Sequence, residues 1–365
     1  MYHELLATPD NCQWGYFDNS VKPNLTVSSG DVVAIECLTH HGGEAPDLLF
    51  DDGVRAVYEA IAEQDRGPGP HIVTGPIAVT AAEPGDVLEC RFLQARPRPG
   101  LPYGVNFHAN WGLLYPPTRA PMEHSTPGEL EGEEHVVVYE ADWESYTARG
   151  VFQYSYPHAE PLPRPGILIP PETTRREPVL NGAAVPLRPH MGTAGVAGRQ
   201  PGKIHTVPPG GFGGNVDNRS FVPGTQMFYP VQVPGALFWA GDTHFAEGDG
   251  EISGTAIEGH LNVLVQFVLH KQLGIRTPVL ETETEIMVHG FHENLDEAVR
   301  IAAAETVFEM GRRWGLSQRE AYSVLSVAGD ARVTQVVNGV KGAHFVVSKN
   351  IVRQAPRSGF GSAGQ

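Results

Sequence analysis

Acidic residues and histidines gather directly after an apolar stretch in the second half of the chain. The apolar stretch reads GALFWAG, and the segment GDTHFAEGDGEISGTAIEGH that ends at His260 contains no Lys or Arg. Asp242 and His244 are two residues apart, so in an extended segment both side chains leave the same face and can share a divalent ion. The spacing predicts a metal or acid–base site, and a solvated glycine–acid turn is the alternative.

Asp249 and Glu251 repeat this spacing, with Gly248 and Gly250 allowing the chain to reverse between the two pairs. A reversal brings four ionisable side chains toward one point, which is costly unless a cation or a shared proton neutralises them. The calcium-loop pattern of Asp and Asn before Gly is not met. Mixed oxygen and nitrogen ligands are more typical of zinc, so we predict a divalent metal, with zinc first and calcium second.

A second acid–histidine segment, ECLTHHGGEAPD, follows a strand-like run. Neighbouring residues of an extended chain project to opposite faces, so only one of His40 and His41 is expected to face the site. Cys37 would need a lowered pKa and a base to act as a nucleophile, and its strand-like context favours a buried, inert thiol. The sequence does not separate metal ligands from loop fasteners among four further histidines near Gly or Pro turns: His71, His108, His190 and His205.

Familiar nucleophile and nucleotide motifs are absent from the sequence. There is no G-x-S-x-G, H-E-x-x-H or G-x-x-x-x-G-K-[ST] segment. The segment GGFGGNVDN fails the dinucleotide fingerprint because Val216 stands where the third Gly is needed. Its glycines are expected to let the backbone turn tightly and present Asn215 and Asp217 from a fixed position.

Composition limits the classes to which the protein can belong. The chain has 365 residues, 41% of them hydrophobic, and a formal net charge of -16. This charge argues against nucleic acid or an anionic membrane as a partner. No apolar run reaches the roughly 20 residues of a membrane helix, and the start lacks a signal-peptide pattern. Three cysteines without a CxxC pair indicate a reduced compartment, so we predict a cytoplasmic protein.

The elements that must position these residues are expected to be strands. With 42 Gly and 31 Pro, the chain is rich in turns, and short β-branched runs recur between them. We predict a mainly β fold (β-rich α+β) with sandwich- or barrel-like strand layers and a few packing helices, the longest near residues 293–328. Asp52 is expected to cap one shorter helix, and Ser317 with Glu320 forms a capping box in the pair near the C-terminus. The Pro-rich passages 96–122 and 157–189 are expected to be long loops.

For domain organisation we predict one unit over 1–353, which could divide into two closely packed β subdomains of about 1–155 and 156–353. Residues 354–365 are expected to form a flexible tail, because this segment has little to bury.

Several segments, in order, carry a family resemblance: HELLATPDNCQWGYFDN, GPIAVTAAEPGDVLECRF, RPHMGTAGVA, GGFGGNVDNRSFVPGTQMFYPVQVPGALFWAGDTHFAEGDGEISGTAIEG and REAYSVLSVAGDARVTQVVN. Over nearly its whole length the chain resembles the acetamidase/formamidase family of amide hydrolases. The resemblance implies hydrolysis of a short linear amide to a carboxylate and ammonia by a β-rich homo-oligomer. Where the family often has Met, Ala and Gln, this chain has Val216, Phe245 and Glu247, and the last two could narrow the pocket and change its charge.

The resemblance also implies roles for individual residues. The expected metal ligands are Asp217, Asp242 and His244, with His40 as a further candidate. The expected catalytic residues are Glu251 or Glu258 for proton transfer, and His41. Asn215, Phe245 and Glu247 are expected to contact the substrate. Two alternatives stay open: an amidase with Cys37 as nucleophile and His40 or His41 as base, and a non-catalytic metal- or carbohydrate-binding β module.

Overall fold

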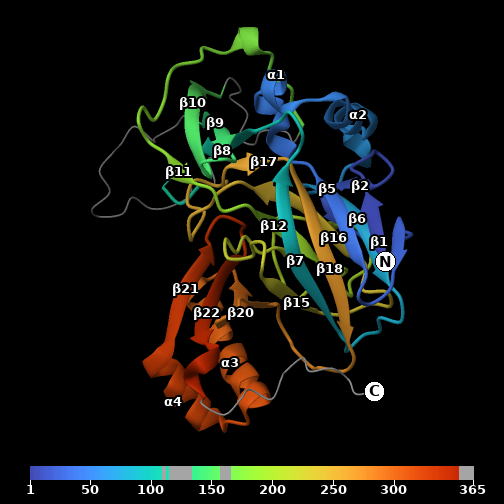
Figure 1. Ribbon diagram of the computed structural model, residues 1–365, viewed down its shortest axis with the longest axis vertical. Coiled ribbons are helices and arrows are strands. Elements are labelled where there is room, and N and C mark those ends of the chain that lie inside the picture. The colour runs from blue at the N-terminus through green and yellow to red at the C-terminus, as the bar shows by residue number, and fades with distance from the viewer. Residues whose placement is uncertain (109–111, 115–133, 157–165, 353–365) are drawn as a thin grey trace.

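The strands of the computed structural model, which describes residues 1–108, 112–114, 134–156 and 166–352, form two large β-sheets and one short two-stranded ladder. Figure 1 shows the long strands β7 and β18 side by side, with β12 and β16 behind them and the helices α3 and α4 at the opposite end from α1 and α2. Among the described residues neither large sheet closes into a barrel. The predicted β-rich fold is therefore confirmed, in its sandwich form.

The first sheet has nine strands and draws on both halves of the chain. In spatial order they are β1 (Tyr2–Leu5), β5 (Val32–Cys37), β18 (Leu261–His270), β7 (Val87–Pro97), β15 (Gln226–Pro230), β19 (Val279–Glu281), β20 (Glu285–His292), β22 (Lys341–Ser348) and β21 (Gly329–Gln335). In β5 and β18 buried residues alternate with partly exposed ones, as the sequences VVAIEC and LNVLVQFVLH predict for strands with one face in the core.

The second sheet has eleven strands and carries the acid–histidine segment. Its main path is β11 (Val185–Pro186), β10 (Thr147–Ser155), β9 (His135–Asp142), β8 (Tyr103–His108), β17 (Glu258–Gly259), β16 (Phe238–His244), β12 (His190–Val196) and β14 (Gly213–Asn215). Outside this path, β16 also pairs with β6 (Ile72–Val79). The strand β6 pairs in turn with β2 (Cys12–Trp14) and β4 (Leu25–Val27). The short ladder joins β13 (Ile204–His205) to β3 (Tyr16–Phe17).

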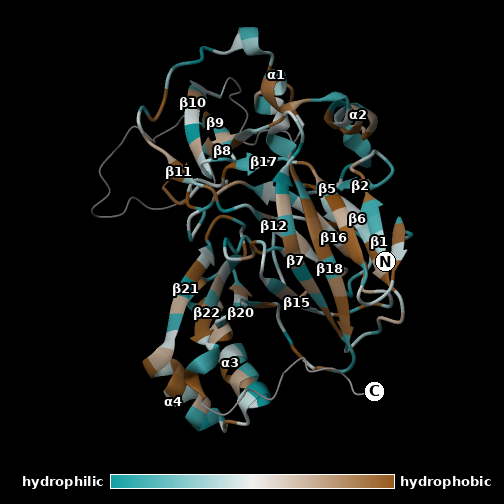
Figure 2. Cartoon of the chain, viewed as in Figure 1, coloured by the Kyte–Doolittle hydropathy of each residue, from teal (hydrophilic) through white to brown (hydrophobic). Residues whose placement is uncertain are grey.

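The main hydrophobic core lies between the two sheets. It contains Val263 and Val265 of β18 from one sheet, and Met191 of β12 and Ala240 of β16 from the other. Figure 2 shows the apolar colouring along β16 and β18. All residues of β6, β12 and β16 are buried, so these strands are covered on both faces. Any charged residue on them is therefore withdrawn from water.

Helices are few and lie outside the sheets. The predicted C-terminal pair is present: α3 (Leu295–Trp314) packs on β20 and β22, and α4 (Gln318–Ala328) follows with the Ser317–Glu320 capping box in place. The N-cap of α2 is Asp51, one residue before the predicted Asp52. The remaining helical segments are α1 (Pro46–Leu49), α2 (Asp52–Ala60), and the 3-10 turns η1 (His40–Glu44), η2 (Glu63–Asp65), η3 (Pro171–Thr173) and η4 (Lys349–Ile351).

Both loop predictions are wrong in part. Residues 103–108 form β8, which pairs with β9 and β17, and residues 185–186 form β11, which pairs with β10. The predicted tail 354–365 lies outside the described residues. Among the helices that are described, none combines the length and the apolar character needed to cross a bilayer.

Candidate active site

The acid–histidine site is built on the end of β16. Its residues Asp242 and His244 are 4% and 0% exposed, because β6, β12 and β17 pair with this strand. Nε2 of His244 lies 3.7 Å from Oδ2 of Asp242, which confirms the predicted proximity of the pair. Burial of a carboxylate among imidazoles in this way needs compensation by charge or hydrogen bonds.

His40 and His71 form one ligand set with Asp242. The ligand atoms of the three side chains lie within 4.8 Å of one another, and Nε2 of His71 is 3.6 Å from Oδ2 of Asp242. His71 immediately precedes β6, the strand that pairs with β16, and so reaches Asp242 from the neighbouring strand. Two imidazoles and one carboxylate are a donor set typical of catalytic zinc sites.

His244 is the hub of a second set with Glu258 and Glu247. Its Nε2 lies 3.3 Å from Oε1 of Glu258, and its Nδ1 lies 3.0 Å from Oε2 of Glu247. The same Glu247 oxygen is 2.7 Å from Nε2 of His190. The other ring nitrogen of His190 is 2.7 Å from the carbonyl oxygen of Arg188, which can only accept a hydrogen bond. Nδ1 of His190 therefore donates to Arg188. The Glu247 oxygen contacts both imidazoles, and its contact with Nδ1 of His244 directs Nε2 of that ring toward Asp242 and Glu258.

Asp217 and Glu251 complete the cluster. Their carboxylates, with His244 and Glu247, form another possible ligand set whose atoms lie within 4.8 Å of one another. Asp217, Asp242 and Glu251 have φ values of 51°, 49° and 47°, in the left-handed region that residues other than glycine rarely adopt. Residues held in such conformations concentrate at functional sites.

Several atoms of the cluster have no hydrogen-bond partner among the described residues. They are Oδ1 of Asp217, Nε2 of His244, Oε1 of Glu247, Oε2 of Glu258 and Nδ1 of His40. Gly192 borders the same space, since a Cβ built there would lie 2.5 Å from Cε1 of His244 and 2.6 Å from Oδ1 of Asp217. Buried acceptors that converge without donors fit a bound cation. The residues present therefore suit a divalent metal.

Burial and like charge shift the ionisation of the cluster. Burial raises the pKa of Glu251 well above its usual range, and the carboxylates of Asp217 and Glu247 add to this. Burial also raises the pKa of Glu258. The pKa of Asp242 is held well below its usual range, because the imidazoles of His71 and His244 outweigh its burial. One carboxylate is thus kept charged, while two neighbours can carry a proton.

A cavity of about 360 Å³ opens onto this cluster. Asp242, Glu251 and Glu258 all line it, together with the imidazoles of His40, His41 and His71. Asn215 lines it as well, and its Oδ1 lies 2.5 Å from Oγ1 of Thr193. Since that oxygen accepts from Thr193, the Asn215 amide nitrogen remains as a donor for a bound molecule.

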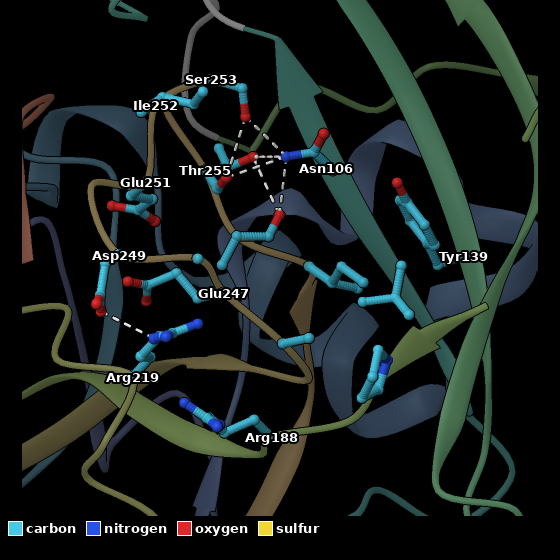
Figure 3. A pocket seen from close by; sticks show the side chains of 16 residues that line it. Asn106, Tyr139, Arg188, Arg219, Glu247, Asp249, Glu251, Ile252, Ser253 and Thr255 are labelled. Carbon is cyan, nitrogen blue, oxygen red and sulfur yellow. Dashed lines mark hydrogen bonds and ion pairs between the residues drawn. The ribbon is translucent and has the colours of Figure 1, made fainter. Parts of the chain in front are cut away.

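A second cavity of about 550 Å³ lies on the other side of the loop that carries Glu251. Glu251 and Thr255 line both cavities. Figure 3 shows Asp249 in this second cavity, directed at Arg219, whose Nε is 2.8 Å from Oδ1 of Asp249. Asp249 therefore does not converge with the Asp242–His244 pair, contrary to the four-group arrangement predicted from spacing.

The structure corrects other expectations about individual residues. Both His40 and His41 line the 360 Å³ cavity, because residues 40–44 form a 3-10 turn and not an extended strand. Phe245 is fully buried in the core between the sheets and packs on Trp143, so its ring does not reach the cavity. Cys37 is 1% exposed in the same core, and burial raises the pKa of its thiol, which disfavours a nucleophilic role.

Sequence reasoning did not assign His71 or His190 to the site. Both lie near Gly or Pro turns in the sequence, and only the pairing of β6 and β12 with β16 brings them to Asp242 and His244. Asn338 donates to Oδ2 of Asp217 at 2.6 Å. No motif or spacing in the sequence indicates this contact.

Comparison with known proteins identifies the family of the chain. The family model for acetamidases and formamidases matches residues 7–347. The chain belongs to the acetamidase/formamidase family. This membership makes it a hydrolase that acts on linear amides, and it confirms the resemblance found in the sequence.

Individual relatives agree with this family over most of the chain. An acetamidase of Mycolicibacterium smegmatis is 26% identical over an alignment covering 96% of this chain and 92% of that protein. A formamidase of Methylophilus methylotrophus is 28% identical, with 87% and 84% covered. The solved structure of an acetamidase from Yersinia enterocolitica has a TM-score of 0.73 at 23% identity, covering 96% and 93% of the two chains. An acetamidase structure from Bacillus halodurans gives 0.69 at 25% identity, covering 95% and 97%. These two structures support the family's fold.

Proposed function

We propose that the chain hydrolyses a linear amide to a carboxylate and ammonia with the aid of a divalent metal, zinc in the first instance, held by His40, His71 and Asp242. The observation that carries this proposal is that these three ligands line the same cavity as two buried carboxyl groups, Glu251 and Glu258. His244, in contact with Asp242, and Asp217, grouped with His244, extend the donor set. When bound there, the metal would supply a Lewis acid that polarises the amide carbonyl and activates water.

Glu258 is proposed as the base. The Ala256 backbone N–H donates to Oε1 of Glu258 at 2.9 Å, and Nε2 of His244 lies 3.3 Å from the same oxygen. These contacts fix one carboxylate oxygen, while Oε2 stays without a partner among the described residues. That oxygen takes the proton from the attacking water.

Glu251 and Asn215 are proposed to act on the amide itself. Burial keeps the pKa of Glu251 raised, so this residue can hold a proton at neutral pH and give it to the departing nitrogen. The Asn215 amide nitrogen donates to the carbonyl oxygen, where negative charge develops as the carbon–nitrogen bond breaks. His41, whose Nδ1 is 3.0 Å from Oε1 of Glu44, is held at the wall of the same cavity and orients the substrate.

Ammonia release tests this proposal together with metal content. Purified protein is assayed on formamide, acetamide and larger amides, before and after chelation and with zinc, calcium or manganese restored. We expect activity that chelation removes and zinc restores. A Cys37→Ala variant is the matched control, because the thiol lies outside the cavity lining, and we expect it to keep the activity. Loss of activity in that variant with unchanged folding would favour the cysteine mechanism. If no amide released ammonia, a non-catalytic binding module would be favoured.

Two broader properties belong to the same proposal. We expect a homo-oligomer, which light scattering after size-exclusion chromatography measures directly. We also expect the protein in the cytoplasm, which cell fractionation tests.

A further inference from the structure

The cavity at the acid–histidine cluster is larger than a formamide or acetamide molecule requires. It measures about 360 Å³. A water molecule occupies roughly 30 Å³ in the liquid, so the four non-hydrogen atoms of acetamide need on the order of 100 Å³. Even with an attacking water added, a large part of the cavity is left for another portion of the substrate.

One part of the cavity wall is apolar. Pro68, Pro70, Val207 and Val337 line the cavity together with the polar cluster, and Val337 is 7% exposed. No Lys or Arg stands among the described lining residues, whereas three carboxyl groups do. An anionic group on the substrate would therefore be repelled, and an apolar group would be favoured.

The apolar wall is held in place by backbone contacts. In the loop that contains Pro68 and Pro70, the Gly67 N–H donates to the Trp14 carbonyl at 2.7 Å and the Gly69 N–H donates to the Gly15 carbonyl at 2.9 Å. The Val337 N–H donates to Oε1 of Gln335 at 3.0 Å. Because these bonds fix the wall, the space is preformed, as in binding sites for ligands larger than a few atoms.

We propose that the substrate is a primary carboxamide with an uncharged, apolar acyl group of four or more carbons, which packs on Pro70, Val207 and Val337 while its amide faces Asp242 and Glu258. The inference rests on the proposed function and specifies its substrate. The reaction consumes one water molecule. The carbon–nitrogen bond breaks, a carbon–oxygen bond forms, and the products are the carboxylate and ammonium.

A homologous series of amides tests the inference. We expect kcat/KM to rise about fourfold for each methylene buried, from acetamide through butyramide to hexanamide. Succinamate, which has the size of a longer amide but carries a carboxylate, is expected to react at least tenfold more slowly than butyramide. A fall in kcat/KM from acetamide onward would overturn the inference while leaving the amide hydrolase in place. If no amide of the series were hydrolysed, the proposed function itself would be overturned.

Variants of the wall connect the preference to the residues. Val337→Phe and Val207→Phe fill the space, and each is expected to lower the ratio of hexanamide to acetamide kcat/KM by at least tenfold. Val327→Phe, on the exposed face of α4 where Val327 is 81% exposed, is the matched control and should keep the ratio. Two wall variants guard against one failing to fold, which circular dichroism and thermal melting monitor. An unchanged ratio in folded wall variants would contradict the inference.

Discussion

Nε2 of His71 lies 3.6 Å from Oδ2 of Asp242, although the two residues are far apart in the sequence. The register of the antiparallel pair β6–β16, in which Gly241 opposes Val73, brings them together. The start of one buried strand thus meets the end of another. The same strand pairing that builds the core places an imidazole beside a carboxylate that is held charged.

Removing either member of this pair is expected to abolish metal binding. For His71→Gln and Asp242→Asn we expect a loss of metal affinity beyond the about 10- to 100-fold that loss of an outer-shell partner costs. Amide hydrolysis should fall in parallel. Elemental analysis and calorimetric titration of the metal-free protein measure the affinity. His292→Gln changes an exposed histidine and serves as control. Full metal content in folded His71→Gln and Asp242→Asn proteins would rule out the proposed ligand set.

The contact of Glu247 with two imidazoles gives a second prediction. In Glu247→Gln the side-chain amide can still hydrogen-bond the ring nitrogens of His190 and His244, so activity should fall less than tenfold. In Glu247→Ala two buried imidazoles lose a hydrogen-bond partner, which is expected to cost about 1–3 kcal/mol of stability and at least a hundredfold in kcat. Denaturant unfolding and steady-state kinetics on both variants check this. Equal behaviour of the Gln and Ala variants would show that Glu247 does not orient His244.

The local part of the site was predictable from sequence, because it depends on neighbours in the chain. The spacing of Asp242 and His244 after an apolar run predicted a shared site, and Ser317 with Glu320 predicted a helix start that the structure contains. Runs of alternating hydrophobic residues predicted the strands of the sandwich. In these cases the number of residues per repeat of the strand or helix decides which side chains lie on the same face.

The rest depended on contacts between distant strands and on local backbone conformation. His71 and His190 joined the site through the pairing of β6 and β12 with β16, and no sequence period encodes that register. The prediction that His40 and His41 point to opposite faces was wrong because their segment forms a 3-10 turn. Asp249 does not lie in the predicted cluster, because it forms an ion pair with Arg219, which is distant in the sequence.

The buried carboxyl of Glu258 predicts a specific pH dependence of turnover. A base must be ionised, and burial raises the pKa of Glu258, so kcat is expected to fall with decreasing pH starting above the ordinary range of a glutamate. Glu258→Gln should lower kcat by about 10²- to 10⁴-fold and remove this acidic limb. A pH–rate profile of both proteins with metal saturation held constant makes the comparison. An acidic limb that persists in the residual activity of Glu258→Gln would assign the base to another residue.

His289 predicts how stability depends on pH. Its Nδ1 is 2.8 Å from the Pro278 carbonyl oxygen and must donate, while its Nε2 accepts from Nδ2 of Asn218 at 2.8 Å. These bonds hold the ring neutral, and burial lowers the pKa of His289 to about 4. In the unfolded chain the pKa is about 6.5, so between these values the unfolded state binds more protons than the folded state.

The free energy of unfolding should therefore decrease as pH falls through this window. The contribution of His289 is fully present above about pH 6.5, is lost at up to about 1.4 kcal/mol per pH unit, and levels off below pH 4. His289→Gln cannot take up this proton, so it should be less stable than the parent at pH 8 but show a shallower slope between pH 6.5 and 4. Urea unfolding at four pH values measures both slopes, with His292→Gln as the exposed control. Equal slopes for the parent and His289→Gln would mean that His289 is not the group that titrates, and that another buried histidine carries the effect.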